Sequence, residues 1–330
     1  MKKEIILTSS TNSCPTVECT EENTAIHTVN CSDNTKFLTK LKELSTKISP
    51  ESTVVFVANA ENWTSDQIKT LINSDIDSPQ TVVLVSSTKT MPKKGGLISW
   101  IYNLPLAPIN AFSCSAQTFQ EITSEEINSP FEATITALVT AMEHQYPVRV
   151  NDSIPVVNTY TPTKDEKASA LRIAAQHINI EELYPELSWE QDASEAAAEA
   201  YEALATLFIK LENWNLALQC INLCDRLQES PRSLALKGLV AKKQGQLLEA
   251  IASLVTSLQE YEKAKKEPTR KTRFIMGEPN LDEVNNCLQK GLEALNKRDN
   301  ETAFQHFTKA VFNFDNFYKK EGIQAQLERA

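Results

Sequence analysis

Glycine is scarce in this chain, with only 7 among 330 residues, well below the average usage of about 7%. Glycine lets a backbone approach a phosphate group closely, so its scarcity leaves few positions for a phosphate-cradling loop. Neither GxGxxG nor GxxxxGK[ST] occurs in the sequence. These absences exclude the two glycine-rich motifs that most often mark a nucleotide-binding loop.

Long apolar runs are also missing. The apolar run near the N-terminus, Ile5–Leu7, has 3 residues, whereas the core of a signal peptide has about 7–15. No run approaches the roughly 18 apolar residues that span a membrane. The sequence therefore predicts a protein without a membrane span, and we expect it in the cytoplasm.

Residues that hold metals are few and scattered. The chain has 4 His, and it contains neither HExxH nor GxSxG. Of its 7 Cys, Cys14 and Cys19 lie near each other, but no second pair of Cys or His completes a zinc site. We expect the cysteines to be reduced and to serve as small apolar residues, as is usual in the cytoplasm.

Positive charge is confined to one segment of an acidic chain. The formal net charge is −10, which argues against nucleic acid as a partner. Within the segment 262–280, six basic residues follow one another closely: Lys263, Lys265, Lys266, Arg270, Lys271 and Arg273. We expect this insert to attract an acidic protein segment, with Lys266, Arg270, Lys271 and Arg273 as the partner-binding residues.

Residues 1–150 alternate short β-branched runs with helical patterns. The predicted strands are 3–8, 25–29, 54–57, 81–85 and 148–150, and the predicted helices are 36–48, 65–72 and 131–146. Such alternation is typical of an α/β domain with a mainly parallel sheet. Residues 89–100 are expected to form a loop, and residues 151–164 an extended linker rich in Pro and Thr.

From residue 165 to residue 330 the composition is typical of helices, and one pattern occurs three times. A small residue is followed twelve positions later by alanine, then by a large apolar residue and another small one. The copies are Ala205, Ala217, Ile221 and Cys224; Gly238, Ala250, Leu254 and Ser257; and Gly291, Ala303, Phe307 and Ala310. Small residues at these places let two antiparallel helices approach closely, while the large residue fills the space between them.

This pattern resembles the tetratricopeptide repeat, a helical hairpin with a period of about 34 residues. The first two copies lie 33 residues apart, but the third follows after 53. The first large position lacks the family's Trp, and Lys237 and Lys290 replace an expected Leu. The resemblance implies a surface that binds another protein. An irregular bundle of helical hairpins is the alternative.

With Asn59–Trp63 after the strand 54–57, Ser32–Thr35 after the strand 25–29, and Glu132 in the helix 131–146, the N-terminal domain resembles a degenerate GT-A glycosyltransferase domain of the family-2 kind. Asn59–Trp63 stands directly after the strand 54–57, where that family places an aspartate-any-aspartate motif. Ser32–Thr35 is similar to the family's Ser/Asp/Thr turn near the nucleotide, and Glu132 lies where the catalytic acid is expected. The resemblance implies a Rossmann-like α/β fold and a nucleotide-sugar donor.

The chemistry of that family explains the candidate site residues. A divalent cation, Mn²⁺ or Mg²⁺, neutralises the leaving diphosphate and needs hard oxygen ligands. By this resemblance Asp33, Asn59 and Glu61 would bind the donor, and Glu61 would hold the metal. Glu132 would be the general base, with Glu125 and Glu126 as alternatives. Asn59 is an amide and Ala133 is not an acid, so the sequence predicts weak or absent catalysis.

Two functions remain open from the sequence. The first is a protein-interaction or scaffold protein that binds a partner through its helical repeats and needs no cofactor. The second is a glycosyltransferase that uses a nucleotide sugar and a divalent metal, with the repeats recruiting a protein acceptor. A third and weaker option is a regulatory subunit that binds a nucleotide without turnover.

Overall fold

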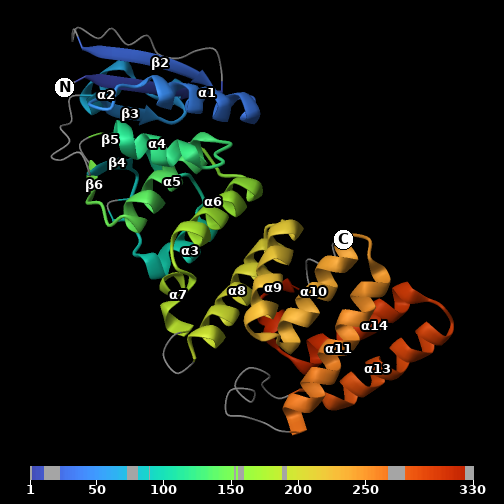
Figure 1. Ribbon diagram of the computed structural model, residues 1–330. Helices are drawn as coiled ribbons and strands as arrows, with labels where there is room; N and C mark the ends of the chain where they lie inside the picture. The colour runs from blue at the N-terminus through green and yellow to red at the C-terminus, as the bar shows by residue number, and fades with distance from the viewer. Residues whose placement is uncertain are drawn as a thin grey trace. The chain divides into compact units, whose positions relative to one another are not determined.

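The computed structural model divides the chain into two compact units, Met1–Leu183 and Tyr184–Ala330. It describes residues 2–10, 23–72, 81–88, 90–151, 154, 160–187, 192–266 and 279–323. The first unit is an α/β domain and the second is built of helices, as Figure 1 shows. This confirms the predicted class of each half of the chain.

A six-stranded mixed sheet forms the centre of the first unit. Its strands are β1 (Lys3–Ser9), β2 (Thr24–Asn30), β3 (Thr53–Val57), β4 (Val82–Ser86), β5 (Ile109–Ser115) and β6 (Val148–Asn151). They lie in the order β2-β1-β3-β5-β4-β6. β5 runs antiparallel to β3 and β4, while the other neighbours are parallel. The sheet is therefore mixed, because the one strand that the sequence pattern missed runs against its neighbours.

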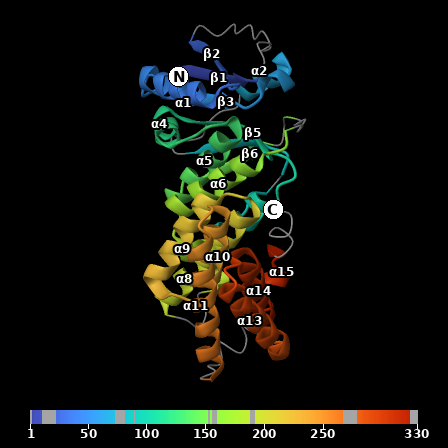
Figure 2. The same ribbon diagram turned by 90° about the vertical axis from the view of Figure 1, so that its right-hand side faces the viewer.

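Helices cover this sheet. They are α1 (Asn34–Lys47), α2 (Ser65–Ile72), α3 (Lys94–Asn103), α4 (Ala116–Ser124), α5 (Pro130–Glu143), α6 (Lys164–His177) and α7 (Ile180–Leu183), with the short 3₁₀ helix η1 (Ala60–Asn62). Ile68 and Leu71 of α2 join a buried cluster with Leu7 and Val57 of the strands. Figure 2 shows α1, α4, α5 and α6 in succession, and each of them contacts the next.

Two expectations for the first unit need correction. Residues 94–103 form helix α3 rather than a loop, because Leu97 and Ile101 bury their side chains completely. The boundary between the units falls after Leu183 rather than at residue 164, since α6 packs against α3 and α5. Tyr160, within the expected linker, is also attached to this unit, because its carbonyl accepts a hydrogen bond from the backbone amide of Ala107 at 2.8 Å.

The described part of the second unit contains three helical hairpins. The helices pair as α8 (Ala193–Lys210) with α9 (Trp214–Gln228), α10 (Pro231–Lys243) with α11 (Leu247–Lys266), and α13 (Leu281–Asn296) with α14 (Asn300–Phe314). The 3₁₀ helix η2 (Pro185–Leu187) precedes them and α15 (Phe317–Lys320) follows. A Cβ added to Gly238 would lie 2.9 Å from the carbonyl oxygen of Ala250, and one added to Gly291 would lie 2.8 Å from the ring of Phe307. The small residues of the sequence pattern thus lie where paired helices approach most closely.

The third hairpin does not repeat the contacts of the second. α10 contacts both helices of the first hairpin, whereas α14 rather than α13 makes the main contact with α11. A buried ion pair fixes this arrangement, in which the Arg232 guanidinium donates to both carboxylate oxygens of Asp315 at 2.6 and 3.0 Å. Tyr261 of α11 donates to the same carboxylate at 2.9 Å.

Candidate functional site

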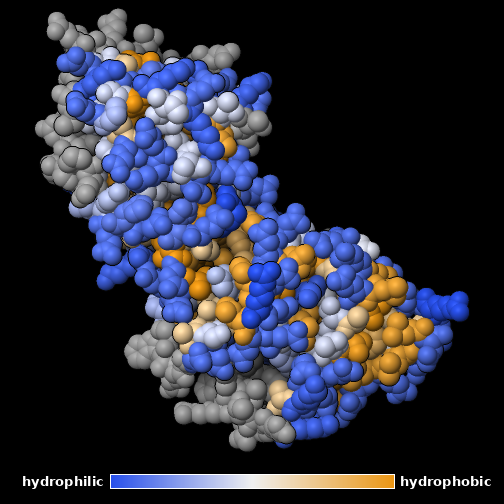
Figure 3. Space-filling view, in the orientation of Figure 1, coloured by the Kyte–Doolittle hydropathy of each residue, from blue (hydrophilic) through white to orange (hydrophobic). Residues whose placement is uncertain are grey.

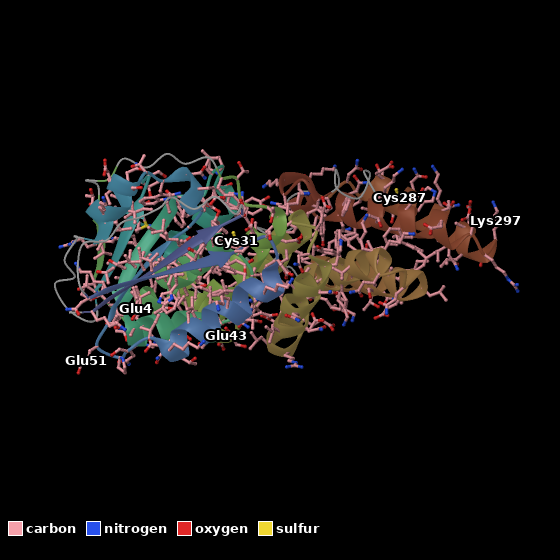
Figure 4. The ribbon with its side chains drawn as sticks, turned by 90° about the horizontal axis from the view of Figure 1, so that it is seen from above. Glu4, Cys31, Glu43, Glu51, Cys287 and Lys297 are labelled. Carbon is pink, nitrogen blue, oxygen red and sulfur yellow. The ribbon has the colours of Figure 1, made fainter. Side chains whose placement is uncertain are left out.

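The carboxyl ends of β1 and β3 meet at a point where the order of the sheet reverses. β1 pairs with β2 on one side and with β3 on the other, and ligands of open α/β sheets bind outside the strand ends at such a point. Cys31, directly after β2, donates its backbone amide to the Ser9 carbonyl at 2.9 Å. In Figure 4, Cys31 lies towards the opposite end of the strands from Glu4 and Glu51. This edge is therefore the first candidate site.

Glu61 holds the two strand ends of that edge together. Its Oε1 accepts hydrogen bonds from the backbone amide and the hydroxyl of Ser10, at 3.2 and 2.6 Å. Burial raises the pKa of this carboxyl group, but the hydrogen bonds from Ser10 and its neighbours outweigh burial and lower the pKa overall. Oε2 is buried without a hydrogen-bond partner in the described part of the chain. Glu61 thus presents an ionised carboxylate at the edge.

Asn59 shapes the turn that leads to Glu61. Its φ of 49° lies in the left-handed region, which Asn adopts more readily than most residues do. The backbone amide of Asn59 donates a hydrogen bond to the Thr8 hydroxyl at 3.1 Å, and that hydroxyl donates one to the Val57 carbonyl at 3.0 Å. A backbone requirement therefore accounts for an asparagine at this position.

Asp33 caps a helix. Its side chain accepts a hydrogen bond from the amide of Lys36 at the start of α1, which is the ordinary role of an N-cap aspartate. It also forms an ion pair with the Lys36 ammonium at 3.0 Å. Asp33 follows β2 and so belongs to the same edge of the sheet as Glu61, but these contacts serve α1.

Glu132 lies inside the contact between α5 and α6. Its carboxylate accepts from the amide of Asn128 at 2.9 Å and from the hydroxyl of Ser169 at 3.0 Å. Burial raises its pKa to about 7, although both hydrogen bonds act in the opposite direction. The residue is only 3% exposed, and none of its hydrogen-bond partners is shared with Glu61. The next residue, Ala133, is buried as well.

The metal expected for a transferase finds little support in these residues. Among the described residues, no group of three or more His, Cys, Asp and Glu side chains is placed to hold a metal ion. Glu61 offers a single carboxylate, and its Oε1 already accepts two hydrogen bonds from Ser10. The donor set therefore does not fit a divalent cation that needs several oxygen ligands.

The second candidate site is an apolar groove in the helical unit. Its volume is about 450 Å³, and helices α11, α13 and α14 all line it. Its apolar lining consists of Val255, Leu258, Leu288, Leu292, Phe307 and Phe314. Leu292 is 55% exposed although it is large and apolar. Orange areas on the surface of the helical unit show exposed apolar residues in Figure 3.

Charged side chains of α11 border this groove. Lys263 and Lys266 both line it, together with Glu262. Lys263 forms an exposed ion pair with Glu260 at 2.5 Å, whereas Lys266 has no carboxylate partner within the described ranges. Of the predicted partner-binding residues, Lys266 therefore lies at the groove, while Arg270, Lys271 and Arg273 fall outside the described residues.

Sequence reasoning missed the apolar part of this site. Leu288 and Leu292 lie one helical turn apart on α13, and Leu292 is next to Gly291. This spacing of two leucines on one helix face is a sequence pattern that could have indicated an apolar surface. Their exposure depends on how α14 packs against α11, which no local pattern records.

Comparisons with known proteins found no match for the chain. No family model, no curated protein and no solved structure matches it. In the part of the chain that the structure describes, no helix has the length and apolar character needed to cross a membrane.

Proposed function

We propose that this chain is a protein-interaction protein whose helical unit binds a segment of another protein. The observation that carries the proposal is the apolar groove lined by α11, α13 and α14, with the buried rings of Phe307 and Phe314 among its lining residues. Burial of a large apolar side chain stabilises a complex by about 1.5–3 kcal/mol. A partner that covers Leu292 and fills the groove therefore stabilises the complex, because apolar side chains of both proteins are buried.

The α/β unit would act as a second platform. The tetratricopeptide-like pattern supports this division of labour, because small residues at the helix crossings build a rigid support for a binding surface. A cytoplasmic location and a partner that is a protein both belong to this proposal.

The test compares two substitutions of exposed leucines in the same unit. Leu292→Glu places a charge in the groove, whereas Leu248→Glu makes the same change at a 68% exposed position of α11 that does not line it. Purified chains are used as bait in extracts of the source cells, and the captured proteins are compared quantitatively. We expect at least one protein that the wild type and Leu248→Glu retain and Leu292→Glu loses. Identical capture by all three chains would contradict the proposal.

A glycosyltransferase remains the second candidate. The position of Glu61 at the reversal point between β1 and β3 favours it, because open α/β sheets bind ligands outside the strand ends at such a point. The helical repeats would then recruit the protein acceptor.

Incubation with a panel of nucleotide sugars and Mn²⁺ or Mg²⁺ tests this second function. Nucleotide release that depends on the metal and disappears in Glu61→Gln would establish the transferase. Because the residues present offer one acidic ligand, we expect release no faster than the background rate.

A further inference from the structure

We infer that the occupant of the α11–α13 groove is an amphipathic helix with an acidic flank, supplied by another protein. This inference rests on the proposed function and names the chemistry of its partner. It departs from the concave surface expected of a regular repeat array, since the groove is lined by α11, α13 and α14.

The shape of the groove favours a helix. Residues of α11 and α13 line it together with Phe307 and Phe314 of α14, which are buried. A fourth helix laid along the groove would cover Leu288 and Leu292 and complete a layer of packed helices. A helix reaches such a groove with apolar residues spaced three and four apart.

The size of the groove fits side-chain anchors rather than a whole helix. Its volume of about 450 Å³ lies within the range of roughly 300–1,000 Å³ that is typical of ligand pockets. The helix backbone would therefore remain above the rim while a few large apolar side chains enter. Val255 and Leu258, which line the groove from α11, would contact these anchoring side chains.

The lysines that line the groove favour acidic residues beside the apolar face of the bound helix. Lys266 lines the groove and has no carboxylate partner among the described residues. Within the described residues, Lys263 pairs with Glu260 one turn earlier on α11, and a solvent-accessible pair of this kind contributes little. Glu262 also lines the groove, so two ammonium groups stand there against one carboxylate. A carboxylate on the incoming helix would pair with Lys266 and compete for Lys263, whereas a basic flank would meet the excess positive charge.

Synthetic helical peptides supply the probe. Peptides of about 18 residues carry leucines at helical spacing and either Glu or Lys on both flanks, and a third peptide has the Glu composition in scrambled order. Fluorescence polarisation measures their binding to the full chain. We expect the Glu peptide to bind about ten-fold more tightly than either of the others.

Matched variants assign the binding to the groove. Lys266→Glu should weaken the Glu peptide about five-fold or more and flatten its salt dependence, while Lys265→Glu, at a neighbouring position that does not line the groove, should leave both unchanged. Leu292→Glu should weaken the peptide strongly, and Leu248→Glu should not. Equal effects of Lys266→Glu and Lys265→Glu, or equal binding of the scrambled peptide, would overturn the inference.

Other occupants give different results. If a second copy of the chain fills the groove, sedimentation will show a dimer that Leu292→Glu dissociates. If residues 267–278 of the same chain fill it, the Glu peptide will bind only after a Gly-Ser linker replaces them. If no peptide binds while extract capture still depends on Leu292, the proposed function stands and the acidic-helix inference is wrong.

Discussion

The buried ion pair between Arg232 and Asp315 should decide whether the third hairpin stays in place. The Asp315 carboxylate is fully buried, and it accepts two hydrogen bonds from Arg232, one from Tyr261 and one from the amide of Phe317. The Arg232 guanidinium also lies 4.2 Å from the centre of the Phe317 ring. These contacts connect α10 and α11 to the end of α14 and to α15.

Asp315→Asn removes the charge with little change of shape. Breaking a buried pair by removing one partner costs about 3–5 kcal/mol, because the other charge stays buried without compensation. Glu202 lies 3.9 Å from Arg232 and offsets part of that cost, so we expect about 3 kcal/mol. Hydrogen exchange of backbone amides in α10 and α14, followed by mass spectrometry, measures the loss as faster exchange in both helices.

Glu301→Gln is the matched control. An ion pair between Lys242 Nζ and Glu301 Oε1, at 2.5 Å, also joins α10 to α14, but the Glu301 side chain is 60% exposed. An exposed pair contributes about 0–1 kcal/mol, so exchange in this variant should stay close to that of the wild type. If both substitutions raise exchange equally, the buried pair does not hold the hairpins as argued here.

Other predictions concern the boundary, the helix crossings and Glu132. Residues 184–330 should be soluble and strongly helical by circular dichroism when expressed alone, and aggregation would show that the two units share a core. Gly238→Ala should destabilise the protein by about 1–3 kcal/mol in urea unfolding, because its Cβ meets the backbone of Ala250, whereas Gly96→Ala, with open space around it, should be neutral or stabilising by up to about 1 kcal/mol. The pKa of Glu132 is raised to about 7 in the folded protein, so the native state binds its proton more firmly and the contribution of this residue to stability falls as pH rises from about 4.5 to 7. Glu132→Gln should therefore gain stability relative to the wild type between pH 5 and pH 8, and a difference that does not change with pH would contradict the assignment.

Much of the α/β unit could be predicted from its apolar runs. The strands 54–57 and 81–85 are continuous and β-branched, and the structure places β3 and β4 there. Strand β5 was not predicted, because its sequence, INAFSCS, mixes small and polar residues with apolar ones. Helix α3 was not predicted, because Gly95 and Gly96 lower the helix propensity of its first turn. The helix forms because the burial of Leu97 and Ile101 outweighs that low propensity.

The helical unit shows a different limit of sequence reasoning. Small residues marked the helix crossings, since the contact of Gly238 with Ala250 lies within one hairpin. The packing of one hairpin on the next depends on Arg232 and Asp315, which are 83 positions apart. No periodic pattern connects two such residues, so the groove and the exposure of Leu292 could not be foreseen.

The most direct test of the interaction proposal is site-specific photo-crosslinking in living cells. A photoreactive amino acid replaces Leu292 in one version of the full chain and Leu248 in another, and adducts are identified by mass spectrometry. We predict that position 292, at the groove, forms an adduct with another protein that position 248 does not form. Crosslinks that are absent from position 292, or the same at both positions, would contradict the central claim that this groove binds a partner.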